Sequence, residues 1–183
     1  MLALQGDFAA HRRMLGELGA CVREVRTPAG LEGLDGLVMP GGESTTMTLG
    51  VEREGLAQPL RDFAASGAPV LGTCAGLIML DRAHLGVLDL TCRRNAFGPQ
   101  VRSFEADLTI DGRSLRAVFI RAPWIEESGP DVEILAEVDG RGVAARQDNV
   151  LAVAFHPELS GDTVVHELFL RGVGTGPAVG ETT

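Results

Sequence analysis

Short apolar runs alternate with helical patterns through the first half of the chain. In 46–65 the apolar residues recur on one face of a helix, whereas 70–73 is a short apolar run typical of a buried strand. The pattern predicts strands at 2–4, 21–25, 36–39 and 70–73, and helices at 8–18 and 46–65. Because strands that alternate with helices form a parallel sheet covered on both faces, this half predicts an α/β fold.

The second half of the chain changes to alternating strands and tight turns. Residues 104–110 alternate apolar and polar side chains, and Asp111-Gly112 and Asp139-Gly140 are turn signals. Further strands are predicted at 117–120, 132–138, 142–146 and 150–155, with a closing helix at 164–171. We therefore expect antiparallel additions to a mostly parallel sheet. A single domain is expected over 1–172, and 173–183, rich in glycine, proline and threonine, is expected to be a loose tail.

One predicted strand-to-helix junction carries candidate chemistry. Cys74 has Gly72 two residues before it and Gly76 two residues after it, which is the construction of a nucleophile elbow. Such a turn projects the thiol outward at the tip of a strand. A helix that starts at Ala75 would direct its positive end and free N–H groups toward the sulfur, which favours a thiolate and can bind an oxyanion. We predict that Cys74 is a nucleophile.

The other two cysteines are predicted to be inert, as most free cysteines in proteins are. Cys21 opens a short apolar run and is expected in the core, and Cys92 has no elbow around it. Three cysteines at irregular spacing do not indicate a disulfide framework. A cytoplasmic location is the simplest interpretation, since the first residues show no signal peptide.

His156 is the predicted base for this thiol. It ends the strand predicted at 150–155 and is followed by Pro157-Glu158. Proline favours an extended conformation in the residue before it, and in an extended segment residues i and i+2 point to the same side. The Glu158 carboxylate could then orient the imidazole as the third member of a triad with Cys74. A capping histidine beside a surface glutamate is the alternative interpretation of this tripeptide.

The remaining three histidines are predicted to have no catalytic role. His11 and His166 fall within helical patterns, where solvated or packed side chains are expected. His84 follows the predicted elbow helix and has no acidic neighbour at a useful spacing. Only His156 lies at a strand end, where the reacting groups of parallel α/β sheets collect.

A glycine-rich loop at 40–43 is predicted to complete the site. Paired glycines allow backbone N–H groups to face a ligand, and Ser44 is a plausible N-cap of the following helix. The loop could be a simple turn. The functional interpretation is that Gly42 supplies an oxyanion donor alongside the N–H of Ala75.

The composition of the chain argues against several classes of function. The 183 residues carry a formal net charge of −9 without a basic cluster, which argues against a nucleic-acid partner. No apolar run approaches the length of a membrane span. The chain has no lysine, so it can neither form a lysine Schiff base nor carry a Gly-x-x-x-x-Gly-Lys phosphate loop. No metal site is predicted.

Taken together, the motifs resemble a known family. Gly-Thr-Cys-Ala-Gly around Cys74 and His156-Pro157-Glu158 resemble the class I, or triad, glutamine amidotransferases. Four further blocks are similar to the glutaminase subunits of pyridoxal 5′-phosphate synthase: 2–6, 40–47, 94–98 and 119–123. The resemblance spans residues 2 to about 170 and implies the three-layer fold of that class.

The resemblance also implies an activity, a partner and residue roles. L-glutamine would be hydrolysed to glutamate and ammonia, and the ammonia would pass to a synthase subunit that makes pyridoxal phosphate. That compound is a product of the partner, so no cofactor is expected here. Cys74 would form a glutamyl thioester, His156 would move the protons and Glu158 would orient it. The implied glutamine contacts are Gly42, Glu43, Ser44, Arg94, Ile120 and Arg121.

Two positions depart from the family pattern, and three alternatives stay open. Pro99 stands where arginine is frequent, and Trp124 follows Ala122-Pro123 where other residues are common. The chain could serve another class I amidotransferase, although Ile78 stands where many of those have glutamine. It could be a thiol peptidase or γ-glutamyl hydrolase that needs no partner. It could also be a regulatory subunit without catalysis, which the complete Cys/His/Glu set disfavours.

Overall fold

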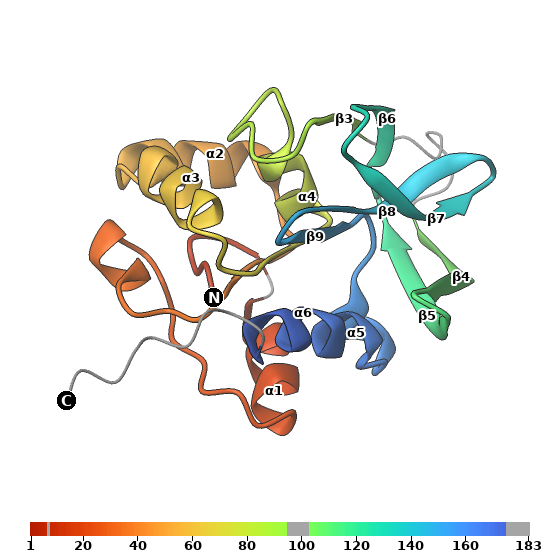
Figure 1. Ribbon diagram of the computed structural model, residues 1–183, viewed down its shortest axis with the longest axis horizontal. Helices are drawn as coiled ribbons and strands as arrows, with labels where there is room; N and C mark the ends of the chain where they lie inside the picture. The colour runs from red at the N-terminus through yellow and green to blue at the C-terminus, as the bar shows by residue number, and fades with distance from the viewer. Residues whose placement is uncertain (7, 95–102, 175–183) are drawn as a thin grey trace.

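The computed structural model describes residues 1–6, 8–94 and 103–174. Within these residues one sheet has the strand order β1-β2-β9-β8-β6-β3, and β7 pairs with β8 outside this path (Figure 1). Its strands are β1 (Leu37–Met39), β2 (Val70–Thr73), β3 (Leu90–Arg93), β6 (Trp124–Ser128), β7 (Glu133–Val138), β8 (Arg141–Gln147) and β9 (Val150–Val153). A separate hairpin joins β4 (Ser103–Ile110) to β5 (Arg113–Ile120).

The sheet changes direction where the sequence pattern changes. β1 pairs with β2 and β2 with β9 in parallel, whereas β8 pairs antiparallel with β9, β7 and β6, and β3 pairs antiparallel with β6. This confirms the predicted α/β class with antiparallel additions. The hairpin of β4 and β5 corrects one detail, because it forms its own sheet instead of extending the main one.

Helices cover both faces of the sheet. In Figure 1, α2 (Ser44–Arg53), α3 (Ala57–Ala65) and α4 (Ala75–Leu80) lie on one side, and α1 (Phe8–Glu17), α5 (Pro157–Ser160) and α6 (Val164–Gly174) lie on the other. One 3-10 turn, η1 (Pro28–Leu31), precedes β1. Because both faces are covered, every residue of β1, β2 and β9 is buried, as their continuous apolar runs require. None of the helices in the described residues is long and apolar enough to cross a membrane.

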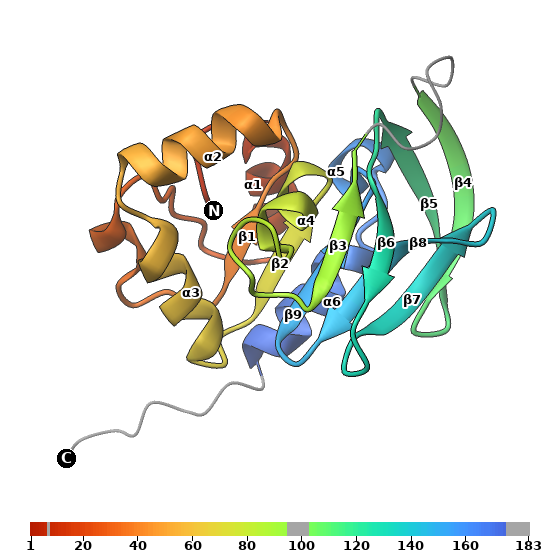
Figure 2. The same ribbon diagram turned by 90° about the horizontal axis from the view of Figure 1, so that it is seen from above.

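Both predicted Asp-Gly turns close hairpins. Asp111 and Gly112 have φ of 49° and 73°, and Asp139 and Gly140 have φ of 51° and 70°. Two successive residues with positive φ are what a tight hairpin turn requires, since its twist then matches that of the strands. The turns connect β4 to β5 and β7 to β8, the two hairpins on the right in Figure 2.

The N-terminal predictions are wrong in part. Segments 2–4 and 21–25 are not strands and meet only in an isolated parallel bridge between Leu2 and Val25. Cys21 was expected in the core but is exposed, because the chain turns inward only at Val25. The helix predicted over 46–65 is divided into α2 and α3 at Gly55, whose φ of 64° ends the first helix.

The last helix is longer than predicted. α6 continues to Gly174, past the end predicted for the domain at 172. Residues 175–183, most of the predicted tail, lie outside the described residues, as do Pro99 and most of the 94–98 block.

Candidate active site

The elbow predicted at Cys74 is present. Cys74 follows β2 with φ 48° and ψ −102°, a strained conformation for a residue other than glycine, and α4 begins at the next residue. A Cβ on Gly76 would lie 2.0 Å from the Met39 carbonyl oxygen, and one on Gly72 would lie 2.9 Å from the Gly76 backbone. The two glycines are therefore required by close contacts between β1, β2 and α4.

His156 and Glu158 meet as predicted, but by a different geometry. His156 Nδ1 lies 2.8 Å from Glu158 Oε1. His156 is the N-cap of α5, and Pro157 occupies the first helical position, so the pair is held by a helical turn and not by an extended segment. The backbone N–H of His156 donates to the Val118 carbonyl at 2.8 Å, which fixes this residue against β5.

The electrostatics of the pair favour an imidazolium beside a carboxylate. Burial lowers the pKa of His156, but its hydrogen bonds to Cys74 and Glu158 outweigh this effect and raise the pKa to about 10. Burial raises the pKa of Glu158, but the close contact with His11 and the hydrogen bond with His156 outweigh this effect and lower the pKa to about 2. The base is therefore charged at neutral pH and is oriented by an ionised acid.

The glycine loop packs directly against His156 and Cys74. A Cβ on Gly41 would lie 2.6 Å from His156 Cε1 and 3.3 Å from Cys74 Cβ, so only glycine fits there. Gly42 has φ 151° and lines the cavity beside the nucleophile. The Glu43 N–H donates to Gln5 Oε1 at 2.7 Å, which fixes the end of the loop.

The N-cap of α2 is Glu43 and not Ser44, which corrects the prediction. The Glu43 carboxylate accepts from the N–H groups of Thr45 at 3.0 Å and Thr46 at 2.7 Å. The hydrogen bonds from Thr46 and Thr45 lower the pKa of Glu43 to about 2. Ser44 is instead the first residue of the helix, and it is buried against the cavity.

These elements enclose a cavity of about 420 Å³, a volume suited to a small molecule. Nine predicted site residues line it: Gly42, Glu43, Ser44, Cys74, Ala75, Arg94, Ile120, Arg121 and His156. Glu158 is 5% exposed and lies behind His156. The lining residues that were not predicted are Gln5, Ile78 and Pro123.

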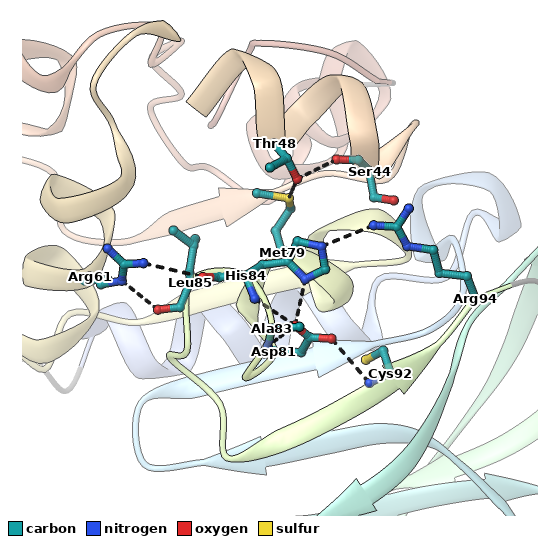
Figure 3. Close-up of polar contacts among 10 residues, drawn as sticks. All are labelled: Ser44, Thr48, Arg61, Met79, Asp81, Ala83, His84, Leu85, Cys92 and Arg94. Atoms are coloured by element: carbon teal, nitrogen blue, oxygen red, sulfur yellow. Dashed lines mark hydrogen bonds and ion pairs between the residues drawn. The ribbon is translucent and has the colours of Figure 1, made fainter. Parts of the chain in front are cut away.

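Arg94 is held at the cavity by a polar network that sequence reasoning missed. Its guanidinium donates to Thr45 Oγ1 at 3.2 Å. It also contacts His84 Nε2 at 3.1 Å, as Figure 3 shows. His84 Nδ1 lies 2.7 Å from the Asp81 carboxylate. His84 therefore has an acidic partner after all, and as a neutral ring it donates to Asp81 and accepts from Arg94.

Two further histidines lie behind the triad. The side chains of His11 and His166 are fully buried, so of the two expectations, solvated or packed, the packed one holds. His11 Nε2 is 3.2 Å from Glu158 Oε2, a contact that was not predicted. The sequence did indicate that His11 is buried, because this residue lies on the apolar face of its helix.

The arrangement can perform nucleophilic chemistry on a carbonyl group. The Cys74 thiol, the His156 imidazolium and the Glu158 carboxylate are neighbours in space, in that order. Arg94 and Arg121 line the same cavity. In the described residues, no group of three or more His, Cys, Asp or Glu side chains is placed to hold a metal ion.

Comparison with known proteins identifies the family. Residues 1–175 match the SNO glutamine amidotransferase family. The chain belongs to this family. Family membership confirms the resemblance that was drawn from the motifs, and it covers the whole of the described structure.

Relatives in this family are similar over nearly their full length. The chain is 52% identical over 190 residues to the pyridoxal 5′-phosphate synthase subunit PdxT of Acidothermus cellulolyticus, which covers 94% of this chain and 92% of the relative. It is 50% identical over 182 residues to the protein of that name from Bacillus licheniformis, with coverage of 94% and 93%.

Solved structures agree with the fold. A crystal structure of a glutamine amidotransferase superposes with a TM-score of 0.90 at 44% identity, and the match covers 94% of this chain and 97% of that one. The structure of PurLQS from Thermotoga maritima superposes with a TM-score of 0.73 at 16% identity, covering 94% of both chains, which is a likeness of fold alone.

Proposed function

We propose that this protein hydrolyses L-glutamine to L-glutamate and ammonia as the glutaminase subunit of a pyridoxal 5′-phosphate synthase. The observation that carries the proposal is the set of Cys74, His156 and Glu158 at a cavity that also contains two arginines. This set occurs in a chain about half identical to curated PdxT subunits. Neither relatives nor geometry favour another class I amidotransferase or a hydrolase that acts alone.

The reaction follows from the positions of the groups. The Cys74 thiolate attacks the side-chain amide carbon of glutamine, and the resulting oxyanion accepts hydrogen bonds from the N–H groups of Ala75 and Gly42. The His156 imidazolium gives its proton to the leaving nitrogen, and ammonia departs from a glutamyl thioester. Neutral His156 then takes a proton from water, which attacks the thioester and releases glutamate and the thiolate.

Substrate selection is assigned to the walls of the cavity. Arg94 and Arg121 offer cationic groups for the α-carboxylate of the amino acid, a charge-assisted interaction that guanidinium groups favour. The 42–44 loop and Ile120 are proposed to complete the glutamine contacts. Arg121 adopts φ 45°, a strained backbone of the kind that collects at binding sites.

The partner is proposed to be a separate synthase subunit that consumes the ammonia. Because this chain has no lysine, any imine chemistry on sugar phosphates belongs to that subunit. We expect no bound cofactor and no nucleic-acid partner, the latter because of the net charge of −9. A cytoplasmic location is proposed, and the three free cysteines fit a reducing compartment.

Ammonia release from glutamine, measured with and without a synthase subunit, tests the proposal. We expect glutamate and ammonia in equal amounts, stimulation by the synthase subunit, and complete loss in Cys74→Ala. Cys92→Ala is the matched control, because that thiol lies outside the cavity. Full activity without stimulation by the partner would favour an independent hydrolase, and unchanged activity in Cys74→Ala would refute the mechanism.

A further inference from the structure

A pair of buried histidines behind Glu158 has no part in the mechanism above. His11 belongs to α1 and His166 to α6, and both residues are 0% exposed. His11 Nδ1 and His166 Nε2 are 2.8 Å apart, and the ring centroids are 5.1 Å apart. The two rings form one hydrogen-bonded unit that is sealed from solvent.

The other nitrogen of His11 faces the triad. His11 Nε2 lies 3.1 Å from Thr73 Oγ1 and 3.2 Å from Glu158 Oε2. Thr73 is fully buried and directly precedes Cys74. His11 therefore connects the strand that carries the nucleophile to the carboxylate that orients the base.

The ionised Glu158 decides which nitrogen of His11 carries the proton. A lone pair on Nε2 would face a carboxylate oxygen at 3.2 Å and repel it, whereas an N–H at that position attracts it. The proton therefore belongs on Nε2. Oε1 of Glu158 pairs with His156 at 2.8 Å, whereas its buried Oε2 has no hydrogen-bond partner in the described residues and relies on the electrostatic attraction of the His11 N–H.

His166 fixes this assignment from the far side. His11 Nδ1 and His166 Nε2 are 2.8 Å apart, so one of them donates to the other, and the tautomer of His166 decides which. His166 Nδ1 is buried without a hydrogen-bond partner in the described residues, which costs less as a bare acceptor than as an N–H. Burial lowers the pKa of His166 to about 4, so this ring is neutral at neutral pH, carries its proton on Nε2 and donates it to the bare Nδ1 of His11.

We propose that His11 is a positioning residue of the active site: its Nε2–H donates to Thr73 Oγ1 and attracts the second, otherwise unpartnered oxygen of Glu158, and His166 sets the tautomer that makes this arrangement possible. The contacts that join Cys74, His156 and Glu158 thereby continue through two buried histidine rings into the core. The kinetic consequence rests on the proposed function, whereas the proton positions and the titration of His156 do not.

Nitrogen-15 NMR of histidine-labelled protein tests the proton positions directly. The chain has four histidines, so each signal can be assigned by single substitution. We expect His11 and His166 each to carry a proton on Nε2 and none on Nδ1. His84 is an internal reference for the opposite tautomer, because its Nδ1 faces Asp81 at 2.7 Å. A proton on His11 Nδ1, or a charged His11 ring, would overturn the proposal.

Substitution of His11 tests the effect on the base. His11→Phe removes the donor but keeps an aromatic ring, and His11→Gln keeps an amide N–H. In a Cys74→Ser background, where Glu158 is the remaining charged partner of the base, we expect the pKa of His156 to fall in His11→Phe and to fall less in His11→Gln. An unchanged His156 titration in folded His11→Phe contradicts the proposal. If that variant does not fold, His11→Gln and His166→Phe are compared with the parent by the same titration, and no shift in either contradicts it.

Glutaminase kinetics with the synthase subunit and the native Cys74 give the functional result. We expect kcat of His11→Phe to fall about tenfold or more, because Glu158 loses the polar group that faces its second oxygen, with KM changed less than about threefold. Leu60→Ala, a buried change on α3, is the control for lost stability. An equal fall of kcat in that control would overturn the proposal. If the parent shows no glutaminase activity at all, the proposed function fails, and NMR still decides the role of His11.

Discussion

The low pKa of Glu158 predicts how the fold responds to acid. Glu158 is 5% exposed, and its pKa falls from the ordinary 4.5 to about 2 in the fold. Because the unfolded chain binds this proton more readily, the stabilisation is fully present above about pH 4.5 and is lost as the pH falls through about 2. Over that window the free energy of unfolding should decrease by about 3 kcal/mol on account of this group.

Urea unfolding of the wild type and of Glu158→Gln, from about pH 7 down to about pH 3.5, measures this loss. Fluorescence of the single tryptophan, Trp124, can report unfolding, because its ring lies 3.5 Å from the Arg141 guanidinium in the fold. Glutamine does not titrate, so the two curves of stability against pH should converge. By about pH 3.5 the wild type should have lost about 1.4 kcal/mol more than the variant.

Glu105→Gln is the matched control for removing a carboxylate. The Glu105 side chain is 56% exposed and is paired with Arg116 at 3.0 Å, and exposed ion pairs contribute little to stability. Its stability should follow the wild-type dependence on pH. If the curves of Glu158→Gln and wild type run parallel, then His11 and His156 do not hold Glu158 in its ionised form, and the reasoning is refuted.

Three further predictions concern the elbow, the cavity and a buried thiol. Gly76→Ala places a Cβ 2.0 Å from the backbone at the end of β1 and should cost about 1–3 kcal/mol in urea unfolding, whereas Gly16→Ala, in open space on α1, should stabilise by about 0.5–1 kcal/mol. His84→Ala removes the acceptor at 3.1 Å from Arg94 and should raise KM for glutamine about fivefold with kcat nearly unchanged; an unaltered KM would show that the network does not orient the arginine. Burial, and then Asp81, raise the pKa of Cys92 well above its ordinary value, so mass spectrometry after alkylation near neutral pH should find this thiol unmodified in the folded protein and modified in urea.

Features that depend on a few adjacent residues could be predicted from the sequence. Gly-x-Cys-x-Gly implied an elbow because the turn needs small residues on both sides of the nucleophile, and the contacts of Gly72 and Gly76 show why. The Asp-Gly turns were predictable because positive φ at two successive positions has a narrow residue preference. The pairing of His156 with Glu158 was also local, although the geometry that produces it was predicted wrongly.

Contacts between distant segments could not be predicted in this way. His11 and His166 are 155 positions apart in the chain, and Gln5 reaches Glu43 across 38. Each contact exists only after α1, the glycine loop and α6 have packed on the sheet. Capping at Glu43 was missed for a different reason: serine and glutamate at neighbouring positions can both supply an oxygen, and the backbone at the loop decides between them.

The separation of nucleophile and base is set by the register of two parallel strands. Thr73 of β2 is the partner of Val153 of β9, and the Cys74 N–H donates to the Val153 carbonyl at 2.8 Å. Cys74 is thus tied to the strand that leads to His156 before any side chain is considered. Because side chains alternate between faces along a strand, a slip of one residue would move every side chain of β9 to the opposite face of the sheet, where different helices pack. Core packing of β2 and β9 therefore fixes the register of the two strands. This register in turn keeps the thiol close to the imidazole.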